Sequence, residues 1–102
     1  MFNRKNIGIV LAEFLGTAIL ALVAIGASKY FNFTAPWYVG LAVGLALATL
    51  VGTIGRVSGA HVNPAITLGL WTLRQISALK ALVYVTAQLL GGFVAFMFVE
   101  YI

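Results

Sequence analysis

Three long runs of apolar side chains dominate the chain and are separated by shorter polar segments. The runs cover residues 7–28, 37–55 and 81–99; the first contains one charged side chain, Glu13, and the other two contain none. A helix that crosses a bilayer needs about 20 mainly apolar residues, so each run is long enough. The pattern therefore predicts three transmembrane helices, over about 7–28, 37–55 and 78–100.

The segment between the second and third runs, SGAHVNPAITLGLW, interrupts the apolar pattern with a histidine, an asparagine and a proline. Asn63 is a good helix N-cap and Pro64 suits the first helical position, so we expect a helix from Pro64 to about Leu73. A helix of that length spans roughly half of the hydrocarbon core. With the small residues that precede it, the segment 56–74 predicts a re-entrant loop and half-helix that enters and leaves the membrane at the same face.

The alternative is a surface loop followed by an amphipathic helix. A helix that lies against water carries a polar stripe. Residues 65–71 have Thr67 as their only polar side chain. The composition of this segment therefore favours the re-entrant interpretation.

The overall composition indicates that the bilayer is the solvent of the chain. Of its 102 residues, 63% are hydrophobic and 8% are charged, and the mean hydropathy is +1.09, which leaves too few charges for a water-soluble surface. The lack of cysteine and the single histidine exclude thiolate and multi-histidine metal sites. We therefore expect no metal, no cofactor and no enzymatic activity. A net charge of +4 is ordinary for a membrane protein with basic cytoplasmic loops, so we also expect no nucleic-acid partner.

The basic residues predict how the chain is oriented in the membrane. With three spans, Lys29 falls alone on one side, and five basic residues fall on the other: Arg4, Lys5, Arg56, Arg74 and Lys80. Basic loops are enriched on the cytoplasmic side. We therefore expect an integral protein of the plasma or inner membrane with a cytoplasmic N-terminus.

Three motifs resemble one known family. The segment Ser58-Gly59-Ala60-His61-Val62-Asn63-Pro64-Ala65-Ile66-Thr67 is similar to the first Asn-Pro-Ala signature of the aquaporin and glycerol-facilitator channels. The segments AEFLGT at 12–17 and AQLLGG at 87–92 resemble the motifs of that family's first and third helices. The family has two such three-helix repeats, inverted, and this chain resembles one N-terminal half-repeat. The resemblance implies an all-α membrane protein with three transmembrane helices and one re-entrant half-helix, in a single half-repeat over 1–102.

The resemblance also implies a function. It predicts a passive channel for water, with glycerol or other small neutral solutes as further candidates, in which two half-helix ends meet at the Asn-Pro-Ala motifs. The implied pore centre is Asn63, Pro64 and Ala65. The implied pore-lining carbonyls are those of Gly59, Ala60 and His61.

Further residues take roles by the same resemblance. The glutamate that matches Glu13 accepts hydrogen bonds from the re-entrant backbone in the family, and we expect Gln88 to do the same from the third span. The family's narrow filter includes an arginine after the second Asn-Pro-Ala, whereas Ile66 follows Ala65 here. Two antiparallel copies would then surround each mouth with apolar side chains, namely Val43 from one copy and Val51, Ala60 and Ile66 from the other.

Half of a channel needs a partner. An identical antiparallel copy, a separate second-half chain and the missing half of a longer protein all stay open, although the charge bias argues against a dual orientation. The resemblance also implies that four such pores assemble as a tetramer in the lipid bilayer. The competing hypothesis is a small proton-coupled multidrug exporter that works as an antiparallel dimer through Glu13, but such exporters have four spans and no half-helix.

Overall fold

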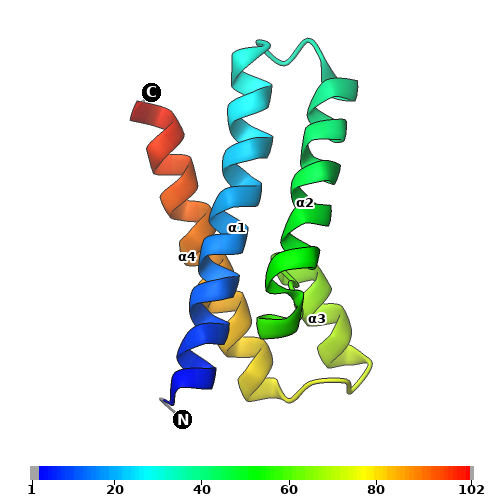
Figure 1. Ribbon diagram of the computed structural model, residues 1–102, viewed down its shortest axis with the longest axis vertical. Coiled ribbons are helices and arrows are strands. Elements are labelled where there is room, and N and C mark those ends of the chain that lie inside the picture. The colour runs from blue at the N-terminus through cyan, green and yellow to red at the C-terminus, as the bar shows by residue number, and fades with distance from the viewer. Residues whose placement is uncertain (1–2, 102) are drawn as a thin grey trace.

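Within residues 3–101, which the structure describes, the chain forms four helices and no strand. The computed structural model places α1 at Arg4–Tyr30, α2 at Pro36–Ser58, α3 at Pro64–Thr72 and α4 at Ala78–Tyr101 (Figure 1). Three of them, α1, α2 and α4, are long and apolar enough to cross a membrane. The all-α fold class is confirmed. Of the half-repeat predicted over 1–102, residues 1, 2 and 102 lie outside the described range.

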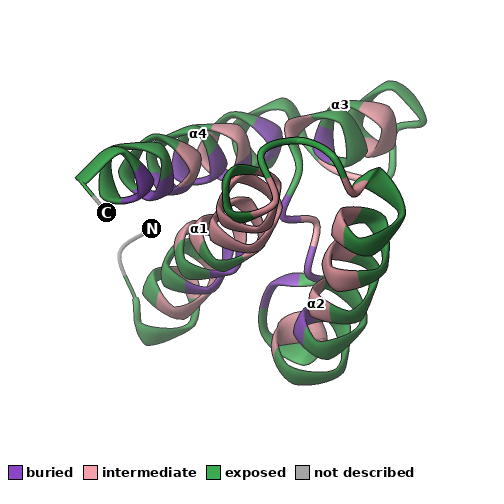
Figure 2. Cartoon of the chain, turned by 90° about the horizontal axis from the view of Figure 1, so that it is seen from above, coloured by how far each residue is buried: buried purple, intermediate pink, exposed green. Residues whose placement is uncertain are grey.

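The first helix holds the arrangement together. Helix α1 packs against both α2 and α4, and α3 packs against α4. Seen from above, α1 lies between the other two long helices, and α3 lies at the side of the bundle (Figure 2). In Figure 1, the C-terminal end of α3 lies at the same end of the bundle as the start of α1. Its nine residues give a length of roughly 14 Å, about half of the hydrocarbon core.

Glycines set the closest approaches of α1 to its neighbours. A Cβ added to Gly91 of α4 would overlap the carbonyl oxygen of Phe14. A Cβ on Gly16 of α1 would lie 2.7 Å from both Ile54 Cδ1 and Val62 Cγ1. Small residues let membrane helices approach closely, and here they let the helix backbones and the re-entrant loop come into contact.

The sequence carries two ridges of small residues, and only one of them is used within the chain. Ala87, Gly91 and Ala95 on α4 are buried against the bundle. The ridge on α2 is exposed, and a Cβ on any of its glycines would meet nothing within 4 Å; its members are Gly40, Gly44, Ala48 and Gly52. The α2 ridge therefore does not serve packing between the described helices.

The ends of α2 and α3 differ slightly from the predicted boundaries. Helix α2 continues through Ser58 and ends at Gly59, which takes the left-handed conformation (φ 88°) that favours glycine. The irregular loop is therefore only 59–63, shorter than the predicted segment from 56 onwards. Asn63 caps α3 by accepting from Ala65 N at 2.7 Å, with Pro64 in the first turn, as the sequence predicted.

Burial is inverted relative to a water-soluble protein. Polar side chains are among the most deeply buried groups: Glu13 and Thr67 are 0% exposed and Gln88 is 1% exposed. Large apolar side chains such as Leu45 and Phe93 lie on the outside. Apolar surface on this scale is stable in lipid, so the structure is that of a membrane protein.

Candidate pore site

The re-entrant loop has an unusual backbone. Gly59, Ala60 and Val62 all have positive φ, at 88°, 49° and 43°. Such angles are strained for a residue with a Cβ, and most of all for a β-branched residue such as Val62. Strain of this kind, of order 1–3 kcal/mol per residue, persists only where surrounding contacts over-determine the conformation.

Glu13 supplies most of those contacts. Its side chain comes from the middle of α1 and accepts four hydrogen bonds, two on each carboxylate oxygen. Oε2 accepts from Ser58 Oγ at 2.6 Å and from His61 N at 3.2 Å. Oε1 accepts from Val62 N at 2.9 Å and from Gln88 Nε2 at 2.7 Å. In the described part of the chain no lysine or arginine pairs with Glu13, so these donors alone offset the cost of burying it.

Gln88 acts differently from what the resemblance implied. It bonds no loop backbone and instead donates through Nε2 to Glu13 and, at 2.9 Å, to Thr67 Oγ1. Thr67 is one turn inside α3, and its Oγ1 also lies 2.9 Å from His61 Nδ1. The cluster Glu13–Gln88–Thr67–His61 thus joins α1, α4, α3 and the loop.

Two further residues complete the support. Tyr84 of α4 donates its hydroxyl to Ser58 O at 2.6 Å, and its ring lies 4.6 Å from the His61 ring, centroid to centroid. Ser58 Oγ accepts from Ala60 N at 3.2 Å while it donates to Glu13. Tyr84 lies four residues before Gln88, so both occupy the same face of α4.

Hydrogen-bond donors and acceptors fix the state of His61. Thr67 Oγ1 already accepts from Gln88, which leaves its hydrogen free to donate to His61 Nδ1. That arrangement leaves the proton of a neutral imidazole on Nε2. His61 Nδ1 therefore acts as an acceptor, as in the neutral ring.

The groups that the resemblance assigned to the pore stay open to contact. Among residues 3–101, the carbonyl oxygens of Gly59, Ala60 and His61 accept no hydrogen bond. Asn63 is exposed, and while its Oδ1 caps α3, its Nδ2 donates to no described residue. One loop thus carries three free acceptors and a free donor beside a helix N-terminus, where the backbone N–H groups give a partial positive charge.

The predicted constriction residues lie on open surfaces of the single chain. Val51 on α2 is 53% exposed and Ile66 on α3 is 52% exposed, while Val43 is partly exposed. Ala60, which we expected beside them, is 7% exposed and faces the chain's own interior. The side chain of Ala60 therefore cannot belong to an outward-facing ring in this conformation.

Sequence reasoning assigned no role to three residues that support the loop: Ser58, Thr67 and Tyr84. Thr67 lies inside an apolar stretch and Ser58 shortly after one. Polar side chains are rare within membrane segments, so both positions could have been recognised as candidates for a role. Tyr84 gave a weaker signal, because a tyrosine in a membrane helix also occurs at the interface.

Comparison with known proteins decides what this architecture is. The family model described as major intrinsic protein matches residues 2–102. This chain belongs to the major intrinsic protein family. It is 44% identical over 95 residues to aquaporin-1 of Homo sapiens, which covers 84% of this chain and 35% of that protein. It is 44% identical over 99 residues to aquaporin FA-CHIP of Pelophylax lessonae, which covers 84% of this chain and 36% of that protein.

A third relative, aquaporin-1 of Rattus norvegicus, is 42% identical over 95 residues, with 84% of this chain and 35% of the relative covered. The chain thus spans about a third of the length of the curated relatives it matches. Membership of the major intrinsic protein family, together with the complete burial of Glu13 against the loop, disfavours the alternative family of small exporters.

Proposed function

We propose that this chain forms one half of a passive water channel, whose pore is completed by a second, inverted half-repeat. The observation that carries this proposal is the loop at 59–63, where free carbonyls and the free amide of Asn63 lie beside the N-terminus of α3. Water donates to the carbonyls and accepts from the Asn63 amide. The positive end of α3 repels cations at the same point.

Two such ends, facing each other near the middle of the membrane, give the pore its proton barrier. A water molecule that accepts from both asparagine amides donates outward in both directions and cannot relay a proton. The partner also covers the loop, because an unsatisfied backbone group in lipid costs several kcal/mol. The exposed ridge on α2 supports the same pairing, since it leaves close-packing surface for a helix that this chain does not contain.

The constriction sets what passes. Val43, Val51 and Ile66 are apolar, and no arginine follows Ala65. With an identical partner the channel therefore admits glycerol and other small neutral solutes besides water, with weak discrimination. In the cell, four such pores form a tetramer in the plasma or inner membrane, with the N-terminus cytoplasmic.

Osmotic shrinkage of liposomes that contain only this chain tests the proposal. Asn63→Asp is the decisive variant, because aspartate still caps α3 but replaces the amide donor with a negative charge. Asn32→Asp makes the same chemical change in the loop between α1 and α2 and serves as the control. Fast shrinkage with a low activation energy that slows only in Asn63→Asp supports a self-paired channel. If both variants shrink like the unmodified chain, Asn63 is not at the pore.

If the liposomes shrink no faster than empty ones, an identical copy is not the partner. Repeating the measurement with a separately made second half-repeat of a relative then tests the pairing itself. A half-repeat that stays inactive with that partner contradicts the proposal.

Ile66→Arg tests the constriction, with Ile66→Leu as its size-matched control. The guanidinium narrows the mouth and binds polar groups, so we expect glycerol flux to fall at least tenfold while water flux changes less. Equal glycerol fluxes in the two variants would place Ile66 outside the pore.

A further inference from the structure

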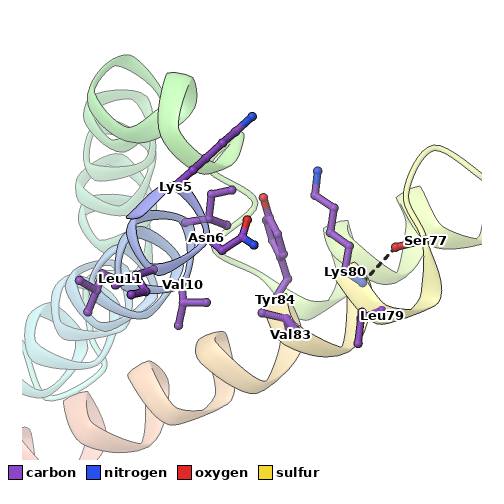
Figure 3. Close-up of a pocket in the computed structure, with 11 residues that line it drawn as sticks. Lys5, Asn6, Val10, Leu11, Ser77, Leu79, Lys80, Val83 and Tyr84 are labelled. Carbon is purple, nitrogen blue, oxygen red and sulfur yellow. Dashed lines mark hydrogen bonds between the residues drawn. The ribbon is translucent and has the colours of Figure 1, made fainter. Parts of the chain in front are cut away.

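A pocket of about 580 Å³ lies between the N-terminal parts of α1 and α4, and Tyr84, which also contacts the re-entrant loop, forms part of its wall. Its walls come from two helices that the sequence places far apart (Figure 3). Six of the lining residues are apolar: Ile7, Ile9, Val10, Leu11, Leu79 and Val83. The polar ones are Lys5, Asn6, Ser77, Lys80 and Tyr84. We propose that this pocket binds an anionic phospholipid, with the headgroup phosphate on Lys5 and Lys80 and the start of an acyl chain along the apolar wall.

Polar and apolar groups are separated within the pocket. In Figure 3 the side chains of Lys5, Lys80 and Tyr84 point toward one side, and Val10 and Val83 lie toward the other. Along α1, the seven residues from Lys5 to Leu11 cover roughly 9 Å of helix, measured from the first Cα to the last. The pocket thus runs from the end of the helix, where headgroups lie, into the hydrocarbon region, which is the profile of an amphiphile.

The two lysines of the pocket, Lys5 and Lys80, favour an anionic ligand. Lys80 Nζ lies 5.4 Å from the ring centroid of Tyr84, and none of the lining residues is acidic. Glu13 is enclosed by the loop, and Glu100 lies twenty residues along α4 from Lys80, about 30 Å away. Neither lysine therefore has a carboxylate partner in the described chain.

The apolar wall selects a lipid over a soluble anion. Inorganic phosphate would leave six apolar side chains without a contact, whereas a phospholipid covers them with its acyl chain. The basic residues Arg56 and Arg74 lie at the same end of the bundle, so the face as a whole attracts anionic lipids. The pocket adds a defined position to that general attraction.

Native mass spectrometry of the purified chain in detergent tests the proposal, with phosphatidylglycerol and phosphatidylcholine of the same acyl chains as probes. The double variant Lys5→Gln/Lys80→Gln removes the pocket charges. The double variant Arg56→Gln/Arg74→Gln removes the same charge from the same membrane face, outside the pocket. A basic residue near a lipid surface contributes about fivefold in affinity, so we expect roughly a 25-fold loss for phosphatidylglycerol in the first variant. The second should lose less than about threefold.

Two further measurements separate the sources of an anion signal. Val83→Trp fills the apolar wall without a change of charge and should also weaken phosphatidylglycerol binding, whereas the exposed Val94→Trp on the same helix should not. Glycerol 1-phosphate should not displace the bound lipid at equal concentration. Displacement by that soluble phosphate, equal losses in the two charge variants, or a change of oligomeric state without lipid binding would each overturn the proposal.

Discussion

Replacing Glu13 by glutamine removes one oxygen acceptor from the buried cluster and leaves its size unchanged. The carboxylate accepts from Ser58 and His61 on one oxygen and from Val62 and Gln88 on the other. An amide offers only one oxygen, so in either orientation its NH₂ group faces two donors. If the NH₂ group faces Ser58, the Ser58 hydroxyl can rotate and accept from it, which removes one of the two donor–donor contacts. At least one backbone N–H, that of His61 or Val62, then loses its only acceptor.

The size of the effect follows from those bonds. A buried donor without a partner costs about 1–3 kcal/mol, and each remaining bond loses part of its charge-assisted strength. We therefore expect Glu13→Gln to lower the free energy of unfolding by roughly 2–4 kcal/mol. The strained backbone at Ala60 and Val62 relaxes at the same time, because its restraints are the ones removed.

Reversible unfolding in mixed detergent micelles, followed by circular dichroism, measures this loss. Glu100→Gln is the matched control, because Glu100 is the only other acid in the chain and its side chain is exposed. Its expected effect is within about 0.5 kcal/mol of zero. Equal stabilities of the two variants would refute the reasoning, and an unchanged loop conformation in Glu13→Gln would refute the role of Glu13 as the restraint on the loop.

Two more predictions concern packing and hydrogen bonding. Gly91→Ala forces α4 away from α1 and should cost about 1–3 kcal/mol by the same unfolding assay, while the neighbouring Gly92→Ala, which meets open space, should cost little. Tyr84→Phe leaves the carbonyl at the end of α2 without its donor and should cost about 1–2 kcal/mol, against no measurable loss for the exposed Tyr101→Phe.

The parts of the fold that local sequence dictates were predictable. Apolar runs long enough to cross a bilayer gave the three long helices, because only a helix satisfies its own backbone in lipid. Asn63 and Pro64 gave the start of α3, since an N-cap and a first-turn proline act within a few residues. The start of the loop was less predictable: Arg56 and Ser58 continue α2, and the helix ends only at the left-handed Gly59.

The candidate site was predictable only in part. Glu13 stood out because a carboxylate in an apolar run must find donors. Its donors could not be read from the chain, since Ser58 and Gln88 are 45 and 75 residues away. For the same reason the sequence does not show that the Gln88 amide bonds side chains, those of Glu13 and Thr67, and not the loop backbone.

By itself, then, the sequence determined the solvent, the helices, the cap of α3 and, through its motifs, the family. The tertiary structure decided which small-residue ridge packs inside the chain, which groups hold the strained loop, and that Ala60 faces inward while Val51 and Ile66 face out. The physical reason is the range of the forces. Helix formation and hydropathy act over a few neighbouring residues, whereas the state of a buried polar group depends on partners that only the packing of distant helices brings within hydrogen-bond distance.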